Sequence, residues 1–215
     1  MQSLRLALCA ACLCILPLTP GPVGAQNGSA RTTPGDGDRR TVRAGVLPPS
    51  LILDGSLADE AWAEAPDSIS NLITIEPRER GEPAGRTVVK IFASARELVL
   101  GIRCEDPDAT GIFSPSKGRD AILDEEDHVL LVLDTFLDGR SGYVFAVNPS
   151  GARFDGLVAA GGDEVNSAWD AIWEAKTSRD ANGWSAEIRI PARSLGFKRG
   201  LTTWGFNVQR RIQRL

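Results

Sequence analysis

The sequence has very little cysteine and histidine for a chain of 215 residues. Cys9, Cys12 and Cys14 lie in an N-terminal stretch with the pattern of a cleaved signal, so Cys104 is the only cysteine of the mature chain. No intramolecular disulfide can then form. A single histidine, His128, is too few for a histidine-based catalytic triad, or for a zinc site without partners of another type.

Long apolar runs are missing outside the N-terminus. There, Arg5 is followed by an apolar stretch over residues 6–18 and by the small residues Val23, Gly24 and Ala25, which together are typical of a secretory signal peptide. We expect cleavage after Ala25, hence residues 1–25 as signal and export of the remainder. The apolar stretch is shorter than the about 20 residues that a membrane-spanning helix needs. A net charge of −4 argues against nucleic acid as a partner.

The composition divides the mature chain into two parts. Residues 26–45 are rich in Gly, Ser, Thr, Asp and Arg with hardly an apolar side chain, which predicts a flexible leader. Residues 46–215 have the composition of one folded domain. Near its start, Asp59 is positioned to cap a short helix that runs to Ala65, with Trp62 plugging one end of the core.

Alternating apolar residues and regularly spaced turns predict about nine short strands in this domain. The clearest are Asp127–Phe136 and Tyr143–Val147, joined by a turn at 138–142, with another strand opening near Ala152. The other strands are expected at residues 69–75, 87–93, 98–104, 172–177, 184–190 and 204–212. So many short strands with one short N-terminal helix predict an all-β fold, an antiparallel β-sandwich of immunoglobulin or jelly-roll type.

Strand parity also predicts which side chains are buried. Cys104 shares its parity with Leu98, Leu100 and Ile102, so we expect a buried, unreactive thiol. Trp184 and Trp204 occupy core positions of their strands. The alternating pattern still continues at Leu215, which suggests that a longer protein continues past this residue.

Five blocks of the sequence resemble, in order, the family 9 carbohydrate-binding modules and their relatives. They are Leu53-Asp54-Gly55 with Asp59, Glu60 and Trp62; the strand from Asp127 to Asp134; Gly183-Trp184 to Ile190-Pro191; Trp204-Gly205-Phe206-Asn207; and 134–156 with Trp169-Asp170-Ala171-Ile172-Trp173-Glu174 and Arg210-Arg211-Ile212. The last block is most similar to the periplasmic N-terminal module of predicted outer-membrane β-barrel proteins. The resemblance covers residues 46–215.

The resemblance implies a non-catalytic, exported β-sandwich that binds an oligosaccharide or polysaccharide through stacked aromatic rings, in carbohydrate catabolism or glycan uptake. It also implies a periplasmic location at the outer membrane. Sugar-binding members have a tryptophan and a glutamate where this chain has Asp124 and Leu130. The alternative is therefore a structural or gating domain of an outer-membrane β-barrel, without a sugar ligand. No paired nucleophile and base, phosphate-binding glycine loop or metal triad predicts an enzyme.

Six residues are candidates for ligand binding. Trp169 and Trp173 flank Asp170, and either ring is a candidate stacking platform, the alternative being that both pack at sheet edges. The others are Arg140, Tyr143, Asn148 and Asp155, which form either a polar site or a scaffold in which Arg140 pairs with Asp155 or Asp138.

An acidic cluster is the candidate metal site. Asp124, Glu126 and Asp127, with Asp120 nearby, offer the oxygen ligands of which calcium needs about six to eight. The resemblance implies such a structural calcium ion, and a solvated acidic loop is the alternative.

Overall fold

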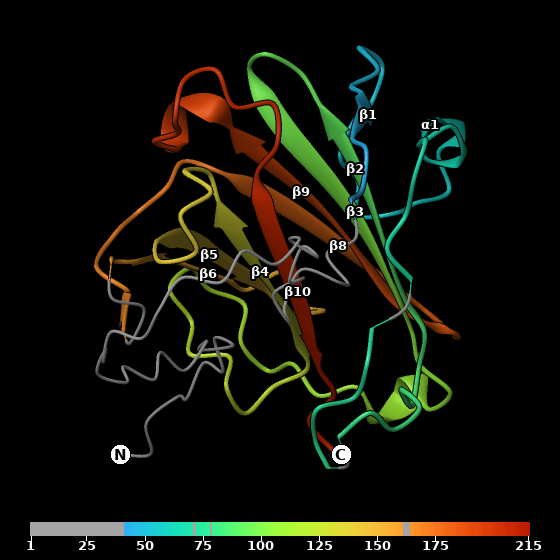
Figure 1. Cartoon of the computed structure of the whole chain (residues 1–215). Helices are drawn as coiled ribbons and strands as arrows, with labels where there is room; N and C mark the ends of the chain where they lie inside the picture. The colour runs from blue at the N-terminus through green and yellow to red at the C-terminus, as the bar shows by residue number, and fades with distance from the viewer. Residues whose placement is uncertain (1–40, 71, 78, 161–163) are drawn as a thin grey trace, which may run out of the picture. The chain divides into compact units, whose positions relative to one another are not determined.

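The computed structural model describes residues 41–70, 72–77, 79–160 and 164–215. The predicted signal peptide and residues 26–40 of the predicted leader lie outside the described residues, as do residues 161–163. The described chain folds into two five-stranded sheets that form the two layers of a sandwich (Figure 1). The predicted all-β sandwich is thereby confirmed. No helix among the described residues is long and apolar enough to cross a membrane.

The first sheet has the order β1-β2-β3-β9-β8 and the second has the order β10-β4-β5-β6-β7. The strands of the first are β1 (Gly45–Val46), β2 (Thr87–Ala93), β3 (Glu97–Glu105), β9 (Gly183–Pro191) and β8 (Glu174–Asp180). The strands of the second are β10 (Gly205–Arg211), β4 (His128–Asp134), β5 (Gly142–Val147), β6 (Arg153–Val158) and β7 (Val165–Asn166). Neighbouring strands are antiparallel except β1 and β2, which are parallel.

The core lies between the sheets and is built from alternate residues of each strand, as the period-two pattern predicted. In β9 the inward set is Trp184, Ala186, Ile188 and Ile190, all fully buried. The inward residues of β4 and β5 face them across the sandwich. Cys104 belongs to this core, and its burial raises the pKa of the thiol to about 12, so it is neutral at physiological pH. Trp204 is half-buried against the core.

A second apolar cluster covers the outer face of the first sheet. Helix α1 (Glu60–Ala63) places Trp62 against Phe92 of β2, with ring centroids 5.0 Å apart. Gly101 of β3 makes room for this ring, because an added Cβ would lie 2.8 Å from it. The predicted burial of Trp62 is confirmed, but the ring lies in this second cluster and not at one end of the core between the sheets. Asp59 is the N-cap residue, but its side chain makes no capping hydrogen bond.

One buried carboxylate holds this cluster to the sheet. Glu187 of β9 points to the outer face, where it is fully buried. Its two oxygens accept hydrogen bonds from the indole Nε1 of Trp62 at 2.8 Å and from the backbone N–H groups of Asp54 and Gly55 at 2.7 and 2.8 Å. The sequence block Leu53-Asp54-Gly55 with Trp62 is therefore bound to β9 through Glu187. We call the hydrogen bonds of Glu187 with Asp54, Gly55 and Trp62 the Glu187 lock.

Two sequence predictions differ from the structure. The segment 69–75 is not a strand among its described residues, since it has only an isolated bridge between Ile69 and Val89, and Ile73 and Ile75 are exposed. The segment does alternate apolar and polar residues, but beyond this bridge its described residues do not pair with a strand of either sheet. The folded domain also begins earlier than predicted, because Val42 packs against the core and β1 starts at Gly45.

His128, the first residue of β4, supports a prediction about acid stability. It is buried, and this burial lowers the pKa of its imidazole, whose Nδ1 donates to the Glu126 carbonyl at 2.9 Å. A histidine with a lower pKa in the folded state binds protons more readily when unfolded. The stability contributed by neutral His128 is therefore complete above about pH 6.5, the ordinary pKa of histidine. This contribution decreases as the pH falls towards the lowered pKa of the folded state.

We expect His128→Gln to flatten this pH dependence, because it removes the only histidine of the chain. The measurement is urea unfolding of the protein and the variant at several values between about pH 5 and pH 7, a range above the ordinary pKa of carboxylates. Equal slopes of stability against pH in the two proteins would contradict the prediction.

Candidate functional site

Asp155 is the centre of a buried polar cluster at the side of the sandwich. It lies on β6, is 1% exposed, and accepts hydrogen bonds from Trp173 Nε1 at 2.9 Å and from the Ala171 backbone N–H at 2.6 Å. It also pairs with the guanidinium of Arg119 at 3.1 Å. These bonds fasten residues 167–173, the connection that crosses from β7 of the second sheet to β8 of the first.

Trp173 is held in this cluster as a buried ring. It lies edge-on to Phe145 with centroids 5.1 Å apart, and the guanidinium of Arg153 lies 5.4 Å from its centre. The structure therefore places Trp173 and Asp155 together, as parts of the scaffold. Trp173 is not an exposed stacking platform, since only 4% of its surface is exposed.

Three carboxylates surround Arg119. Asp120, Asp155 and Asp170 bring oxygens within 4.8 Å of one another. Arg119 Nη2 donates to Asp155 and Asp170 and to the carbonyl of Ala171. The positive charge of this cluster thus comes from a side chain of the protein. Asp155 and Asp170 accept N–H hydrogen bonds, and Asp120 forms an ion pair with Arg119 Nε at 3.5 Å. These carboxylates do not fit the about six to eight oxygen ligands of a calcium ion.

The predicted calcium ligands are not brought together either. Asp124 is exposed, whereas Glu126 and Asp127 are buried. Glu126 accepts hydrogen bonds from Asn148 Nδ2 at 2.7 Å and from the Ser116 backbone N–H at 3.2 Å. Asp127 accepts from the Phe113 backbone N–H at 2.9 Å. Glu126, Asp127 and Asn148 hold the loop at residues 113–127, so calcium binding stays a prediction without an assembled ligand set among the described residues.

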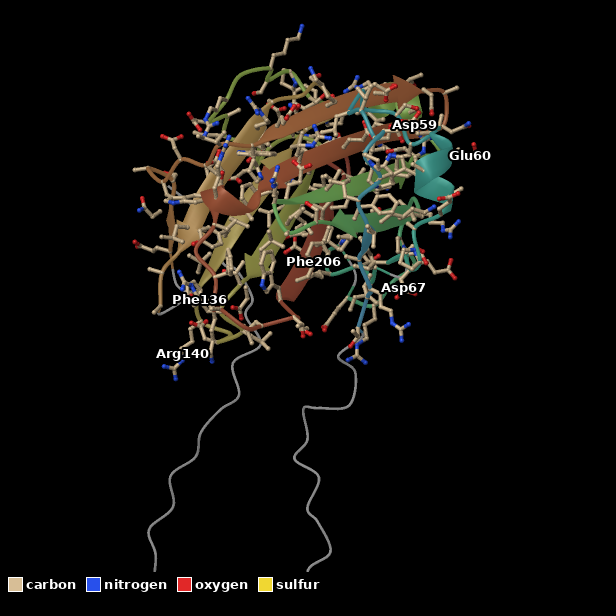
Figure 2. All side chains as sticks on the ribbon, turned by 90° about the horizontal axis from the view of Figure 1, so that it is seen from above. Asp59, Glu60, Asp67, Phe136, Arg140 and Phe206 are labelled. Carbon is tan, nitrogen blue, oxygen red and sulfur yellow. The ribbon has the colours of Figure 1, made fainter. Side chains whose placement is uncertain are left out.

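Arg140 lies apart from these clusters, exposed in the hairpin between β4 and β5 (Figure 2). The predicted pairing of Arg140 with Asp155 is wrong, because Asp155 is paired with Arg119. Asp138 holds the turn through backbone groups, accepting from the N–H of Arg140 at 2.8 Å and of Ser141 at 2.9 Å. These bonds lower the pKa of the Asp138 carboxyl. The side chain of Arg140 is exposed.

Five aromatic residues lie at the end of the sandwich where β4 turns into β5. Tyr143, at the start of β5, packs against Trp169 with centroids 4.9 Å apart, and its hydroxyl accepts a hydrogen bond from the Gly196 backbone N–H at 2.8 Å. A Cβ added to Gly196 would lie 3.6 Å from the Phe136 ring. Next along the chain, Phe197 lies 6.0 Å from Trp204. We call this group the aromatic end: Phe136, Tyr143, Trp169, Phe197 and Trp204.

Several rings of the aromatic end are open to solvent while their backbone is fixed. Phe136 is 43% exposed and Phe197 is 45% exposed, and Trp169 and Trp204 are half-buried. The Asp134 carboxylate accepts hydrogen bonds from the backbone N–H groups of Phe136 and Gly139 at 3.2 and 2.8 Å, which hold the loop that carries Phe136. Figure 2 shows Arg140 on the same hairpin as Phe136, where it is an exposed hydrogen-bond donor. Exposed rings on rigid loops are suited to stacking against a flat apolar ligand face.

Sequence reasoning found Trp169, Tyr143 and Arg140 of this end and missed Phe136 and Phe197. Phe136 ends the strand predicted at Asp127–Phe136, but β4 ends at Asp134 and Phe136 lies in the loop that follows. Phe197 lies in the loop before β10, where no periodicity assigns a side chain to the core or to solvent. The signal present in the sequence was an aromatic residue directly after the end of an alternating strand, in Thr135-Phe136-Leu137, and another in the polar segment Gly196-Phe197-Lys198.

Comparison with known proteins gives matches among solved structures alone, since no family model and no curated protein matches the sequence. A family 9 carbohydrate-binding module from Caldicellulosiruptor kristjanssonii in complex with cellotriose aligns with a TM-score of 0.54 at 17% identity, covering 79% of this chain and 75% of that one. A family 9 module from the same organism in complex with glucose aligns with a TM-score of 0.50 at 18% identity, covering 78% and 75%. The fold is thus that of family 9 carbohydrate-binding modules, as the sequence resemblance predicted.

Proposed function

We propose that this protein is an exported, non-catalytic carbohydrate-binding module that holds a glycan at the aromatic end. The observation that carries the proposal is the exposure of Phe136 and Phe197, beside the half-buried Trp204, at the end of the sandwich that holds the buried Tyr143. A pyranose ring has an apolar C–H face that stacks on such rings, while its hydroxyls need fixed partners such as Arg140. The two solved modules with this fold, described with cellotriose and with glucose, add support.

The aromatic end explains how a sugar can bind although Asp124 and Leu130 replace the tryptophan and glutamate of sugar-binding members. Asp124 precedes the first residue of β4, whereas Phe136 follows its last residue, Asp134. The two positions therefore lie at opposite ends of the same strand. The proposed platform does not depend on the residues in which this chain departs from the family pattern.

The signal-like N-terminus supports export, and the resemblance of residues 134–156 to modules of outer-membrane proteins supports a periplasmic location. We propose a role in carbohydrate catabolism or glycan uptake, with an outer-membrane β-barrel as a partner. Two observations favour a module without catalysis. The acidic cluster around Arg119 is engaged within the scaffold, and the sole histidine is buried with its Nδ1 donating to a carbonyl.

We expect Phe136→Ala and Phe197→Ala each to weaken oligosaccharide binding about five- to thirtyfold, because each removes one stacking surface worth about 1–2 kcal/mol. The measurement is a titration of the purified protein with xylo- and cello-oligosaccharides, followed by tryptophan fluorescence. Both variants keep all five tryptophans, including Trp204 beside Phe197, so the reporter is unchanged.

Phe113→Ala is the matched control. Phe113 is 47% exposed, like the two test residues, and lies near Asp127, at the other end of β4. We expect this variant to bind as the unaltered protein does. A loss of binding in Phe113→Ala with none in Phe197→Ala would move the site away from the aromatic end. A flat fluorescence response at millimolar sugar would contradict sugar binding and favour the alternative of a structural domain of a barrel protein.

A further inference from the structure

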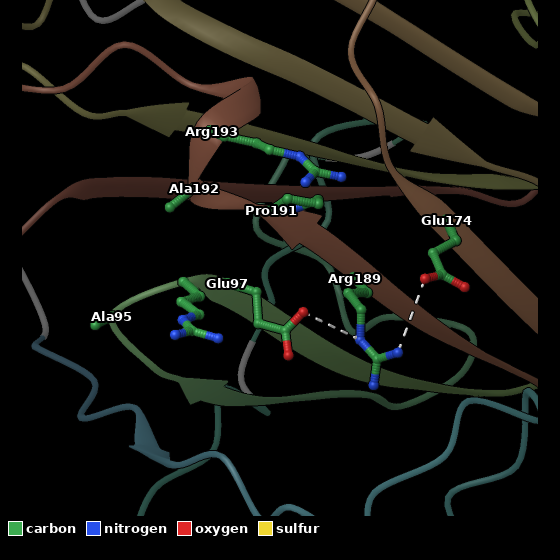
Figure 3. Close-up of a pocket in the computed structure, with 8 residues that line it drawn as sticks. Ala95, Glu97, Glu174, Arg189, Pro191, Ala192 and Arg193 are labelled. Carbon is green, nitrogen blue, oxygen red and sulfur yellow. Dashed lines mark ion pairs between the residues drawn. The ribbon is translucent and has the colours of Figure 1, made fainter.

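A depression of about 550 Å³ opens on the first sheet, where β3 and β8 begin and β9 ends (Figure 3). The short 3-10 helix Ala192–Ser194 forms one of its walls. The hydrogen bond from the Ala192 N–H to the Arg96 carbonyl at 2.7 Å joins this helix to the turn before β3. We call it the arginine depression, after its lining residues Ala95, Arg96, Glu97, Glu174, Arg189, Pro191, Ala192 and Arg193.

The two carboxylates of the depression are directed to one guanidinium. Figure 3 shows Arg189 between Glu97 and Glu174, with its Nε 3.5 Å from one carboxylate and its Nη1 3.8 Å from the other. Its Nη2 also donates to the Leu51 carbonyl at 3.2 Å. Arg189 therefore pairs with both glutamates and offsets one of their two negative charges.

Arg96 and Arg193 supply two further positive charges, so the guanidinium groups exceed the carboxylates of the depression by one. Both side chains are exposed, and within the described ranges neither lies within ion-pair distance of a carboxylate. Their backbones are nevertheless fixed. The Ser94 hydroxyl accepts a hydrogen bond from the Arg96 N–H at 3.2 Å, and the Ser194 hydroxyl donates to the Ile172 carbonyl at 2.7 Å. Two available guanidinium groups thus line one concave surface on a rigid frame.

We propose that the arginine depression is a binding site for an oxyanion, in which Arg96 and Arg193 both contact a carboxylate or sulfate group. Guanidinium groups bind such oxyanions through paired N–H donors, a geometry that also gives specificity. Three guanidinium groups against two carboxylates make the depression locally positive on a chain of net charge −4. This local charge favours an acidic ligand over a neutral one.

The position of the depression indicates what would carry the oxyanion. Arg193 lies four residues before Phe197, and the same connection between β9 and β10 carries both. A glycan stacked on the aromatic end can therefore extend to the depression around the short helix. Since this step rests on the proposed function, the ligand class is an acidic glycan, with a uronic acid or a sulfated sugar as the residue bound by Arg96 and Arg193.

The test compares a neutral cello-oligosaccharide with oligosaccharides of the same length that carry either uronic acid or sulfate groups, by isothermal titration calorimetry. We expect at least one acidic oligosaccharide to bind on the order of tenfold more tightly than the neutral one, and the one preferred identifies the group. Raising the salt concentration should reduce this preference, because salt screens charge. Free glucuronate and sulfate are titrated separately to measure the depression alone.

Two variants report on the depression. The double variant Arg96→Ala, Arg193→Ala should abolish the acidic preference and leave neutral binding unchanged. Glu174→Gln should increase affinity for the acidic ligand about two- to threefold, because it removes a negative charge from the depression; damage to the fold would not produce a gain. Arg43→Ala, Arg211→Ala is the control for the loss of two positive charges, since both residues are exposed and outside the depression.

The outcomes separate this inference from the proposed function. Equal affinity for neutral and acidic oligosaccharides would overturn the oxyanion site and leave sugar binding intact. An acidic preference that survives in the double variant, or that the control variant also loses, would overturn it as well. Binding of free anions that requires Arg96 and Arg193, without binding of any oligosaccharide, would retain the site and reject the proposed function.

Discussion

Glu187→Gln should destabilise the protein by about 3–4 kcal/mol, the largest effect that we expect from a single isosteric change. The carboxylate of Glu187 is fully buried and accepts three N–H hydrogen bonds, from Trp62 and from the backbone of Asp54 and Gly55. A glutamine has only one oxygen acceptor, and its amide N–H₂ would face donors. At least one buried N–H then loses its partner, and the hydrogen bonds that remain lose their charge.

The effect should extend to the cluster that the Glu187 lock holds. With the lock weakened, α1 and residues 51–57 keep only the bonds of Ser185 and Arg189 to the Gly55 and Leu51 carbonyls as side-chain ties to β9, and the Trp62 ring becomes more accessible to water. The measurements are urea unfolding and the tryptophan emission of the native state. Glu125→Gln, at an exposed position, is the matched control and should change stability by less than about 0.5 kcal/mol. A Glu187→Gln variant as stable as this control would show that the lock contributes little.

Asp155→Asn should cost about 2–4 kcal/mol and also weaken glycan binding. The aspartate accepts from Trp173 Nε1 and the Ala171 N–H and pairs with Arg119, all within 3.2 Å. An asparagine keeps the shape but presents an amide N–H₂ to one of these donors, so a buried donor or the guanidinium loses its partner. Because the connection fastened here also carries Trp169, the aromatic end should lose its fixed geometry.

Asp170→Asn tests whether the burial of Asp155 is the cause of the destabilisation expected for Asp155→Asn. Asp170 pairs with the same Arg119 at 2.9 Å, but its side chain is 70% exposed, so we expect a cost of no more than about 1 kcal/mol. Urea unfolding compares the two variants, and sugar titration by tryptophan fluorescence measures the functional consequence. Equal destabilisation by the two substitutions would refute the assignment of Asp155 as the buried anchor of this connection.

The predicted fold was close to the observed one because strand alternation is a local signal. The segment predicted at 87–93 coincides with β2, and the three successive antiparallel strands predicted from Asp127 onwards are β4, β5 and β6. The prediction of a strand at residues 69–75 was wrong because pairing is not a local property. Its alternation resembles that of a strand, but a strand also needs a partner, and partners are set by the tertiary arrangement.

The candidate site was predicted in part. Trp169 and Tyr143 do lie together at the aromatic end, while Trp173, Asp155 and Asn148 proved to be scaffold. Buried scaffold and exposed site draw on the same residue types, since aromatic and polar side chains serve both. The distinction depends on burial, which for residues in turns and crossovers has no periodic signature in the sequence.

The sequence by itself determined the sandwich, the core-facing positions and the signal-like N-terminus, because alternation and composition are properties of neighbouring residues. Only the tertiary structure decided that Glu187 binds Trp62, 125 residues away, and that Arg119 occupies the centre of the acidic cluster. It also decided that Phe136, Phe197 and Trp169, from three separate connections, meet at one end. Such contacts follow from the register of the strands and the paths of the loops, which depend on the packing of the whole chain.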